Sequence, residues 1–284
     1  MADHDLSGFE RDAFTHGGST RPVLRRGSGP AVIVIAEIPG ITPKVLEFAE
    51  RVAALGCTAV LPVLFGTPGR DPHPTAHGLL RGAAYTASSA WNVCVSREFT
   101  VLATGRSSPV VSWLRALSAY EHQRCGGPGV GAVGMCLTGG FALAMAVDEH
   151  LLVPVLSQPS LPLGITARRR DGIDISSEDL ATVRGRCERE GLQVVGLRFR
   201  SDRLAPDARF AFLRRELGDA FVAVELEDDD ANPEAVLPPH SVLTEHLVDQ
   251  PGQATRAALD QVLGLLRTRL LPETARTTQT APTA

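Results

Sequence analysis

The sequence of 284 residues has no excess of positive charge and almost no lysine. Its 28 basic residues, among which Lys44 is the only lysine, are outnumbered by 32 acidic residues, and the formal net charge at pH 7 is −4. Proteins that follow a phosphate backbone carry a positive surface. We therefore expect no nucleic-acid partner, and we interpret the preference for arginine over lysine as codon bias.

Long apolar runs and a targeting segment are also missing. No run approaches the roughly 18 apolar residues that span a bilayer, and the opening MADHDLSGFERD has neither the basic nor the apolar stretch of a secretory signal. The five cysteines are odd in number and form no CxxC pair, which argues against a zinc or redox motif. We therefore expect no membrane partner and a cytoplasmic location, where thiols stay reduced.

Strand and helix patterns alternate along most of the chain. Residues 31–38 and 57–65 are continuous apolar runs typical of strands buried in a parallel sheet. Between them, Thr42 and Pro43 supply the N-cap and first-turn proline of a helix. Further strands are expected at 129–136, 153–159, 192–199 and 220–226, and helices at 109–124, 176–190, 205–217 and 253–270.

This alternation predicts a single α/β domain over residues 1–271. We expect a doubly wound, mostly parallel sheet with helices on both faces, preceded by an N-terminal hairpin that turns at Gly17 and Gly18. Residues 272–284 have little to bury, and we expect them to form a disordered tail.

The segment Gly-Met-Cys-Leu-Thr-Gly-Gly, residues 134–140, carries most of the functional information. It joins an apolar strand to an apolar helix, so its turn stands at the carboxyl edge of the sheet, where open α/β sheets bind ligands. The N-terminus of the helix would favour a thiolate at Cys136. Alternatively, Cys136 is a small buried residue at a tight turn. A dinucleotide fingerprint at Gly129, Gly131 and Gly134 is disfavoured, because these glycines do not follow the strand.

Four stretches together resemble the dienelactone hydrolase family of the α/β-hydrolase fold. They are VIVIAEIPGI, AVLPVLFG, VGAVGMCLTGG, and SDRLAP followed by PPHS, and they run in the family's order over roughly residues 22–266. A cysteine at the turn combined with an acidic residue at the end of the first core strand is more specific than the turn alone. The resemblance implies an α/β-hydrolase domain, a Cys-His-Asp triad, and hydrolysis of a small ester or lactone without a cofactor.

The resemblance also implies a role for each matching residue. Cys136 matches the nucleophile, Asp202 the triad acid and His240 the base, in the chain order of α/β-hydrolases. Connections leaving one edge of a parallel sheet can bring these side chains together, with His240 taking the proton and Asp202 orienting the imidazole. Alternatives remain open: Asp202 could cap the following helix, Asp207 is a nearby competitor, and His246, expected in a helix, is a second histidine.

Three further positions match the family's catalytic machinery. Glu37 matches a glutamate that contacts the resting thiol and helps to generate the thiolate. A carboxylate beside a thiol raises the thiol's pKa unless it moves or is neutralised, so a carboxylate paired with an arginine is the alternative reading of Glu37. The backbone N–H groups of Leu137 and Ile38 match the family's oxyanion hole, with one donor after the nucleophile and one from the first-strand loop.

Two departures from the family pattern limit what the resemblance implies. Thr138 stands where the family commonly has glycine, and we expect it to crowd the helix of the turn. Thr244 stands four residues after His240, where members acting on dienelactone carry an arginine that helps to bind the substrate's carboxylate. Arg97 is a candidate replacement cation, and the alternative for it is a solvated charge or an ion pair. Dienelactone itself is therefore doubtful as the substrate.

The expected function is cysteine-dependent hydrolysis of a small ester or lactone through a thioester acyl-enzyme. Two alternatives stay open: a binding or regulatory protein on a hydrolase scaffold, and an acyltransferase in which an alcohol or amine replaces water. No metal is expected, because His73 and His77 stand in a Pro/Gly-rich stretch with Asp71 as their one acidic neighbour. The sequence carries no signal for the oligomeric state.

Overall fold

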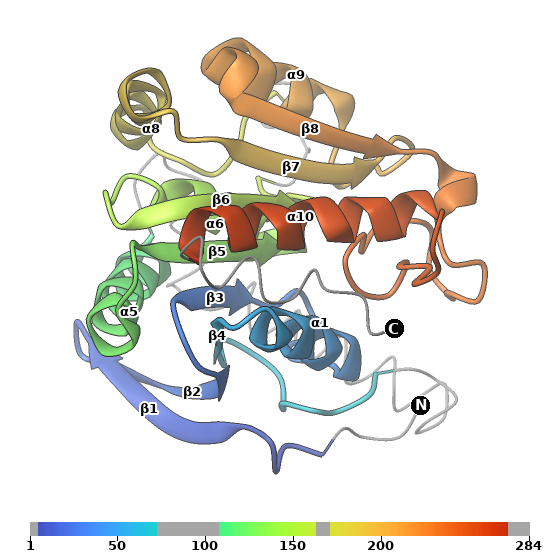
Figure 1. Cartoon of the computed structure of the whole chain (residues 1–284). Coiled ribbons are helices and arrows are strands. Elements are labelled where there is room, and N and C mark those ends of the chain that lie inside the picture. The colour runs from blue at the N-terminus through green and yellow to red at the C-terminus, as the bar shows by residue number, and fades with distance from the viewer. Residues whose placement is uncertain (1–4, 73–107, 163–170, 272–284) are drawn as a thin grey trace, which may run out of the picture.

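A single sheet organises the molecule, and the computed structural model describes it through residues 5–72, 108–162 and 171–271. Its eight strands lie in the order β1-β2-β4-β3-β5-β6-β7-β8 (Figure 1). They are β1 (Glu10–His16), β2 (Ser19–Gly27), β3 (Ala31–Ile35), β4 (Thr58–Pro62), β5 (Val130–Met135), β6 (Leu151–Ser157), β7 (Val194–Phe199) and β8 (Phe221–Leu226). β1 and β2 form an antiparallel hairpin, β2 pairs antiparallel with β4, and the remaining pairings are parallel. The predicted fold class is confirmed.

Helices cover both faces of the sheet. α1 (Pro43–Ala54) and α10 (Ala254–Leu270) pack on the face turned to the viewer in Figure 1. The other face carries α5 (Pro109–Cys125), α6 (Gly139–Met145), α8 (Ser177–Glu190) and α9 (Asp207–Leu217). Short 3-10 turns are η2 (Cys136–Thr138), η3 (Gly218–Ala220) and η4 (Asp228–Asp230). Each face therefore has its own apolar core, with the sheet between the two.

The central strands are buried from end to end, as their continuous apolar sequences predict. Every residue of β3, β5 and β7 is buried, because alternate side chains enter the two cores. α1 begins as predicted: the Thr42 hydroxyl accepts a hydrogen bond from the Val45 N–H at 3.4 Å, and Pro43 occupies the first turn. The helix ends before Gly56, whose φ of 93° suits glycine.

The first core strand is shorter than predicted, and the difference matters for the site. It ends at Ile35, not at Ile38, because the chain turns where the Gly40 N–H donates to the Glu37 carbonyl at 2.7 Å. Gly40 has a φ of 133°, and a Cβ there would lie 2.6 Å from the Phe65 carbonyl oxygen, so this turn requires glycine. Glu37 and Ile38 consequently lie in a turn at the carboxyl edge of the sheet.

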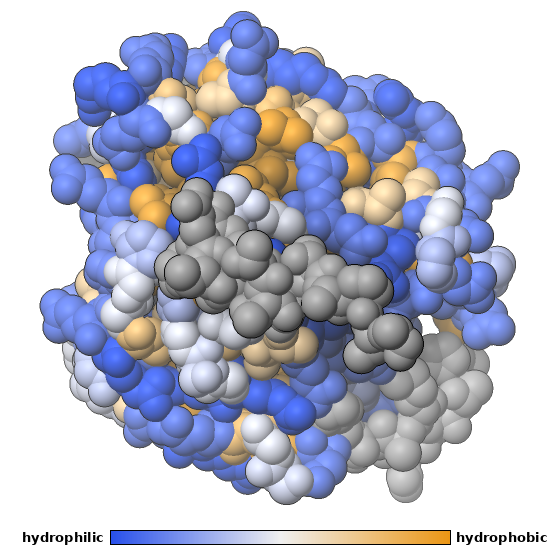
Figure 2. Space-filling model, in the orientation of Figure 1, coloured by the Kyte–Doolittle hydropathy of each residue, from blue (hydrophilic) through white to orange (hydrophobic). Residues whose placement is uncertain are grey.

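The surface of the α1 and α10 face is largely hydrophilic (Figure 2). Apolar residues gather on it above α10, over β7 and β8, where Val222 and Val224 are only partly buried. Among the described helices, none combines the length and the apolar character needed to cross a membrane. The predicted tail, residues 272–284, lies outside the described residues, and its disorder stays a prediction.

Candidate active site

Cys136 occupies a sharp strand-to-helix turn, as the sequence predicts. β5 ends at Met135, and η2 and α6 follow at once. The backbone of Cys136 has a φ of 55°, a left-handed conformation that residues other than glycine rarely adopt. A Cβ on Gly134 would lie 2.2 Å from the Thr138 carbonyl oxygen, so the turn closes too tightly for a larger residue there. The turn thus presents Cys136 at the carboxyl edge of the sheet, with the helix N-terminus beside it.

Thr138 helps to hold this turn together. Its side chain is fully buried, and its hydroxyl accepts a hydrogen bond from the Met135 N–H at 2.9 Å. The same hydroxyl donates to the carbonyl oxygen of Ile35 at 2.8 Å, which ties the turn to the end of β3. Thr138, which stands where the family commonly has glycine, therefore makes hydrogen bonds that glycine could not make. From the sequence we expected only that it would crowd the helix of the turn.

His240 and Asp202 form a hydrogen-bonded pair between two loops at the same edge of the sheet. The Nδ1 atom of His240 lies 2.7 Å from Oδ2 of Asp202, and the two side chains are 17% and 4% exposed. The other carboxylate oxygen of Asp202 accepts from the Leu204 N–H at 2.9 Å. Asp202 therefore keeps a proton on Nδ1 of the imidazole, and Nε2 is the ring nitrogen left for proton transfer.

Cys136 lies close enough to His240 to act on the pKa of its ring. Burial of the imidazole lowers its pKa, but its interactions with Asp202 and with the nearby Cys136 outweigh burial and raise the pKa of His240 to about 11. Within the described residues, the Nε2 atom of His240 is buried and makes no hydrogen bond. The raised pKa favours the protonated, imidazolium form of the ring.

The competing acid and histidine lie elsewhere. Asp207 forms an ion pair with Arg198, and its side chain is 83% exposed. His246 lies in a turn, so the expectation that it is helical was wrong. Its Nδ1 accepts from the Ser241 N–H at 3.1 Å and its Nε2 donates to the Leu237 carbonyl at 3.0 Å, while burial lowers its pKa. Both ring nitrogens of His246 are therefore occupied by backbone.

Glu37 is buried and is held by three uncharged donors. Gln158 Nε2 and Ser241 Oγ donate to its Oε2 at 3.1 and 2.6 Å, and the Thr244 hydroxyl donates to its Oε1. Within the described part of the chain, neither an arginine nor Cys136 makes a hydrogen bond with this carboxylate. Glu37 is thus bound to the loop that carries His240, an arrangement that neither interpretation of its sequence position anticipated.

Gln158 is a site residue that sequence reasoning missed. It follows β6 with a φ of 36°, and its N–H donates to the Leu197 carbonyl at 2.7 Å. Its Oε1 accepts from the Val242 N–H at 3.4 Å while its Nε2 donates to Glu37. The available signal was a polar Ser-Gln pair directly after an apolar strand, which indicates a strand end but not a partner.

The two predicted oxyanion donors lie in two different turns at the carboxyl edge of the sheet. Leu137 directly follows Cys136 at the start of η2, where helical N–H groups have no partner within the helix. Ile38 lies in the turn after β3, and both side chains pack against the same apolar core. Arg97, His73 and His77 lie outside the described residues, so the expectations for them stay predictions.

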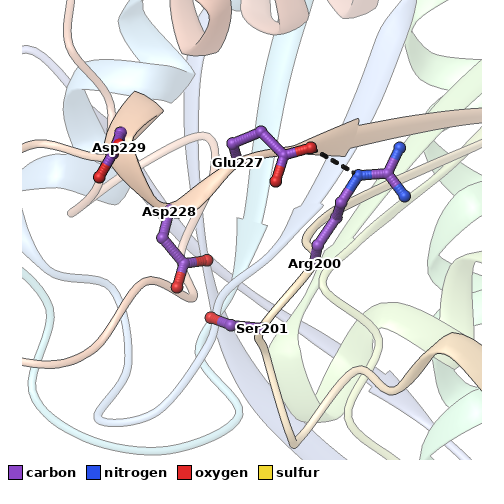
Figure 3. Close-up of a pocket in the computed structure, with 5 residues that line it drawn as sticks. All are labelled: Arg200, Ser201, Glu227, Asp228 and Asp229. Atoms are coloured by element: carbon purple, nitrogen blue, oxygen red, sulfur yellow. Dashed lines mark ion pairs between the residues drawn. The ribbon is translucent and has the colours of Figure 1, made fainter.

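A pocket of about 470 Å³ opens where β7 and β8 end, next to Asp202 in the sequence (Figure 3). It is lined by Arg200, Ser201, Glu227, Asp228 and Asp229. Arg200 pairs with Glu227 at 2.9 Å across it. The lining includes none of Cys136, His240 and Asp202 and is mainly acidic.

The sequence of residues 19–157 matches the model of the dienelactone hydrolase family. No curated protein matches the chain.

Solved structures of similar fold cover nearly the whole chain. A candidate dienelactone hydrolase of Klebsiella pneumoniae is 17% identical with a TM-score of 0.56, over 90% of this chain and 97% of its own. A dienelactone hydrolase-like promiscuous phosphotriesterase from metagenomic libraries is 16% identical with a TM-score of 0.56, over 92% and 98%. A dienelactone hydrolase of Anabaena variabilis is 12% identical with a TM-score of 0.54, over 93% and 99%. At these identities the likeness shows the fold.

Proposed function

We propose that this chain, whose residues 19–157 match the dienelactone hydrolase family, is a member of that family and hydrolyses small carboxylic esters or lactones with Cys136 as the nucleophile. The observation that carries the proposal is the 2.7 Å hydrogen bond between His240 and Asp202, combined with the position of Cys136 in the sharp turn after β5 at the same edge of the sheet. Nucleophile, base and orienting acid in contact are the usual requirement for acyl transfer to a side chain.

In the first half of the reaction, the Cys136 thiolate attacks the carbonyl carbon of the ester. The negative charge that develops on the carbonyl oxygen is stabilised by the N–H groups of Leu137 and Ile38. The intermediate collapses as the C–O bond breaks, and the imidazolium of His240 gives its proton to the leaving alkoxide. The products are an alcohol and a thioester on Cys136.

In the second half, water replaces the alcohol. Neutral His240 takes a proton from the water as its oxygen attacks the thioester carbonyl, while Asp202 stabilises the imidazolium that forms. Cleavage of the C–S bond releases the carboxylic acid, which ionises, and restores the thiolate beside the imidazolium. The cycle uses no cofactor, and each proton that His240 receives is returned or released.

The preferred substrate is an ester that does not need a carboxylate for binding, because this chain lacks the family's arginine that binds one. Thr244 occupies that position, and its hydroxyl donates to Glu37. A neutral hydroxyl already engaged in a buried hydrogen bond gives a substrate carboxylate little to bind. We therefore expect uncharged esters or lactones to be hydrolysed in preference to dienelactone.

Hydrolysis of p-nitrophenyl acetate and butyrate, and of a simple lactone, tests the proposal. Wild type should turn over, Cys136→Ala should fall to background, and mass spectrometry should find an acylated Cys136 under single-turnover conditions. Cys187→Ala, at a partly buried cysteine of α8, is the matched control and should retain wild-type rates. Equal background rates for wild type and Cys136→Ala with every substrate would favour a binding protein.

The acyltransferase alternative is separated by adding an alcohol or an amine to the same assay. For a hydrolase, carboxylic acid remains the main product and the rate of p-nitrophenol release is unchanged. Release that depends on the added acceptor, with a new ester or amide as the main product, would contradict hydrolysis as the principal activity.

A further inference from the structure

We propose that Glu37 is the positioning residue of the loop that carries His240, and that Thr244 is its specific partner in this chain. The inference rests on the proposed function, because it assigns the role of a residue within that site. It replaces direct action of Glu37 on the thiol, which the family resemblance implies, by action through the position of the base.

The two oxygens of the Glu37 carboxylate hold the two ends of one short turn. Oε2 accepts from Ser241, the residue after His240, at 2.6 Å, and Oε1 accepts from Thr244. Within this turn the Thr244 N–H donates to the Ser241 carbonyl at 3.3 Å. A single buried carboxylate thus fixes the backbone that follows the base at two points.

The anchors of this loop stand on both sides of the nucleophile's strand. Glu37 follows β3 and Gln158 follows β6, and the sheet order places β5 between those strands. Gln158 contacts both the carboxylate of Glu37 and the backbone N–H of Val242. Hydrogen bonds therefore tie the loop to the ends of the two strands that flank the strand of Cys136. These ties set the distance between the imidazole of His240 and the sulfur of Cys136.

The hydrogen bonds of Glu37 leave its carboxylate committed to the loop. It is 6% exposed, and its three donors are all neutral. A buried carboxylate must be satisfied by such donors, and breaking one of them to reach a thiol would leave a hydroxyl or an amide unpaired. A threonine at 244 adds a donor to this set, whereas the family's arginine would reach for substrate.

Glu37→Ala and Glu37→Gln separate positioning from action by charge. The amide of glutamine can accept from Ser241 and Gln158 through its oxygen and donate to the Thr244 hydroxyl, which rotates to accept. We expect Glu37→Ala to lower kcat by about 10²-fold with KM changed far less, since small misplacements of reacting groups have effects of this size. Glu37→Gln should recover most of that loss and leave the pH dependence of Cys136 alkylation by iodoacetamide unchanged.

If Glu37 acts on the thiol through its charge, the result is different. Glu37→Gln would then be as slow as Glu37→Ala, or would shift the pH profile of alkylation, and either outcome overturns the proposal. Thermal unfolding of each variant shows whether it is folded at the assay temperature, and a folded Glu37→Ala with wild-type kcat also overturns it.

Thr244 provides a milder variant for the case that Glu37→Ala fails to fold. Thr244→Val keeps the side-chain volume and removes the donor, so kcat should fall by about 10-fold, the equivalent of one neutral hydrogen bond. Thr244→Ser, which keeps the hydroxyl, should restore it. Equal kcat in Thr244→Val and wild type would contradict the proposal. If the wild type has no esterase activity, or if the activity survives in Cys136→Ala, the proposed function is contradicted instead.

Discussion

The turn that carries Cys136 and the loop that carries His240 are built in different ways. The turn, residues 134–140, lies directly between β5 and α6, and its backbone fixes it: Cys136 has a φ of 55°, and Gly134 leaves no room for a Cβ. The loop, residues 227–253, joins β8 to α10 with η4 as its one regular element. It is held by side chains that reach it from distant parts of the chain.

Several contacts show how dispersed the support of the loop is. Glu37 and Gln158 bind residues 241–244 from two strand ends. His246 fastens the loop to itself through backbone groups, and Asp249 pairs with Arg51 of α1. Local backbone fixes the position of Cys136, the proposed nucleophile, whereas long-range polar contacts fix the position of His240, the proposed base. The two regions should therefore respond differently to mutation. Substitutions in the loop should mainly change kcat and kcat/KM, and substitutions at the glycines of the turn should mainly change the free energy of unfolding.

The largest effect is expected from replacing His240, the proposed base. His240→Gln should lower kcat/KM for p-nitrophenyl acetate by about 10³-fold, within the range that general acid–base groups contribute. Glutamine can still fill the space beside Asp202, so thermal unfolding should change little. His16→Gln, at an exposed position of β1, is the matched control and should have wild-type kinetics. A His240→Gln enzyme within 10-fold of wild type would show that the loop does not deliver the base.

A smaller effect, visible in the pH dependence, is expected from Asp202→Asn. Asp202 helps to raise the pKa of His240 by hydrogen bonding and charge, and burial opposes it. Without the carboxylate, burial remains and the pKa of His240 falls, so the imidazolium that the proposed mechanism requires is lost at lower pH. The alkaline limb of the kcat/KM profile should move to lower pH, and kcat near neutrality should fall by about 10²-fold or more.

Asp207→Asn is the matched control for that experiment. Asp207 is the other acidic candidate after β7, but it pairs with Arg198 and is largely exposed. Its removal should leave the pH profile of kcat/KM in place. An unchanged profile in Asp202→Asn, or a profile that moves in Asp207→Asn, would contradict the assignment of the acid.

The difference between the turn and the loop also determines which parts of the site can be predicted from the sequence. The turn at Cys136 can be predicted because its determinants are neighbours: an apolar strand, closely spaced glycines and an apolar helix. The strand ends that carry Glu37 and Asp202 are also readable, since turn residues follow apolar runs. Even there, the apolar pattern makes the strand before Glu37 three residues too long, because the Gly40 turn that shortens it needs close approach of the Phe65 backbone.

The support of His240 could not be predicted from the sequence alone. Gln158, Ser241 and Thr244 are common polar residues whose role appears only when the fold brings them to one carboxylate. The same holds for His246, for which the sequence predicts a helix although its ring nitrogens bind backbone of an irregular loop. Local propensity carries no information about the contacts of Gln158 and Glu37, because the loop residues that they bind are 84 residues away from Gln158 and 204 or more from Glu37.

The smallest effect is expected at the turn, from Gly139→Ala. Gly139 has an ordinary helical φ of −53°, but a Cβ there would lie 2.7 Å from the Cα of Pro159. Because the obstacle is backbone, the chain must shift, and such overpacking costs about 1–3 kcal/mol. For a protein of this size we expect thermal unfolding some 2–4 °C lower per kcal/mol.

Gly264→Ala is the control that isolates packing from helix propensity. Gly264 lies in α10, and a Cβ added there would meet no atom within 4 Å, so alanine should raise stability by about 0.5–1 kcal/mol. Opposite signs at two helical glycines would show that the turn is set by backbone packing against Pro159. If Gly139→Ala also stabilises the protein, the turn is looser than the loop, and the contrast between them is wrong.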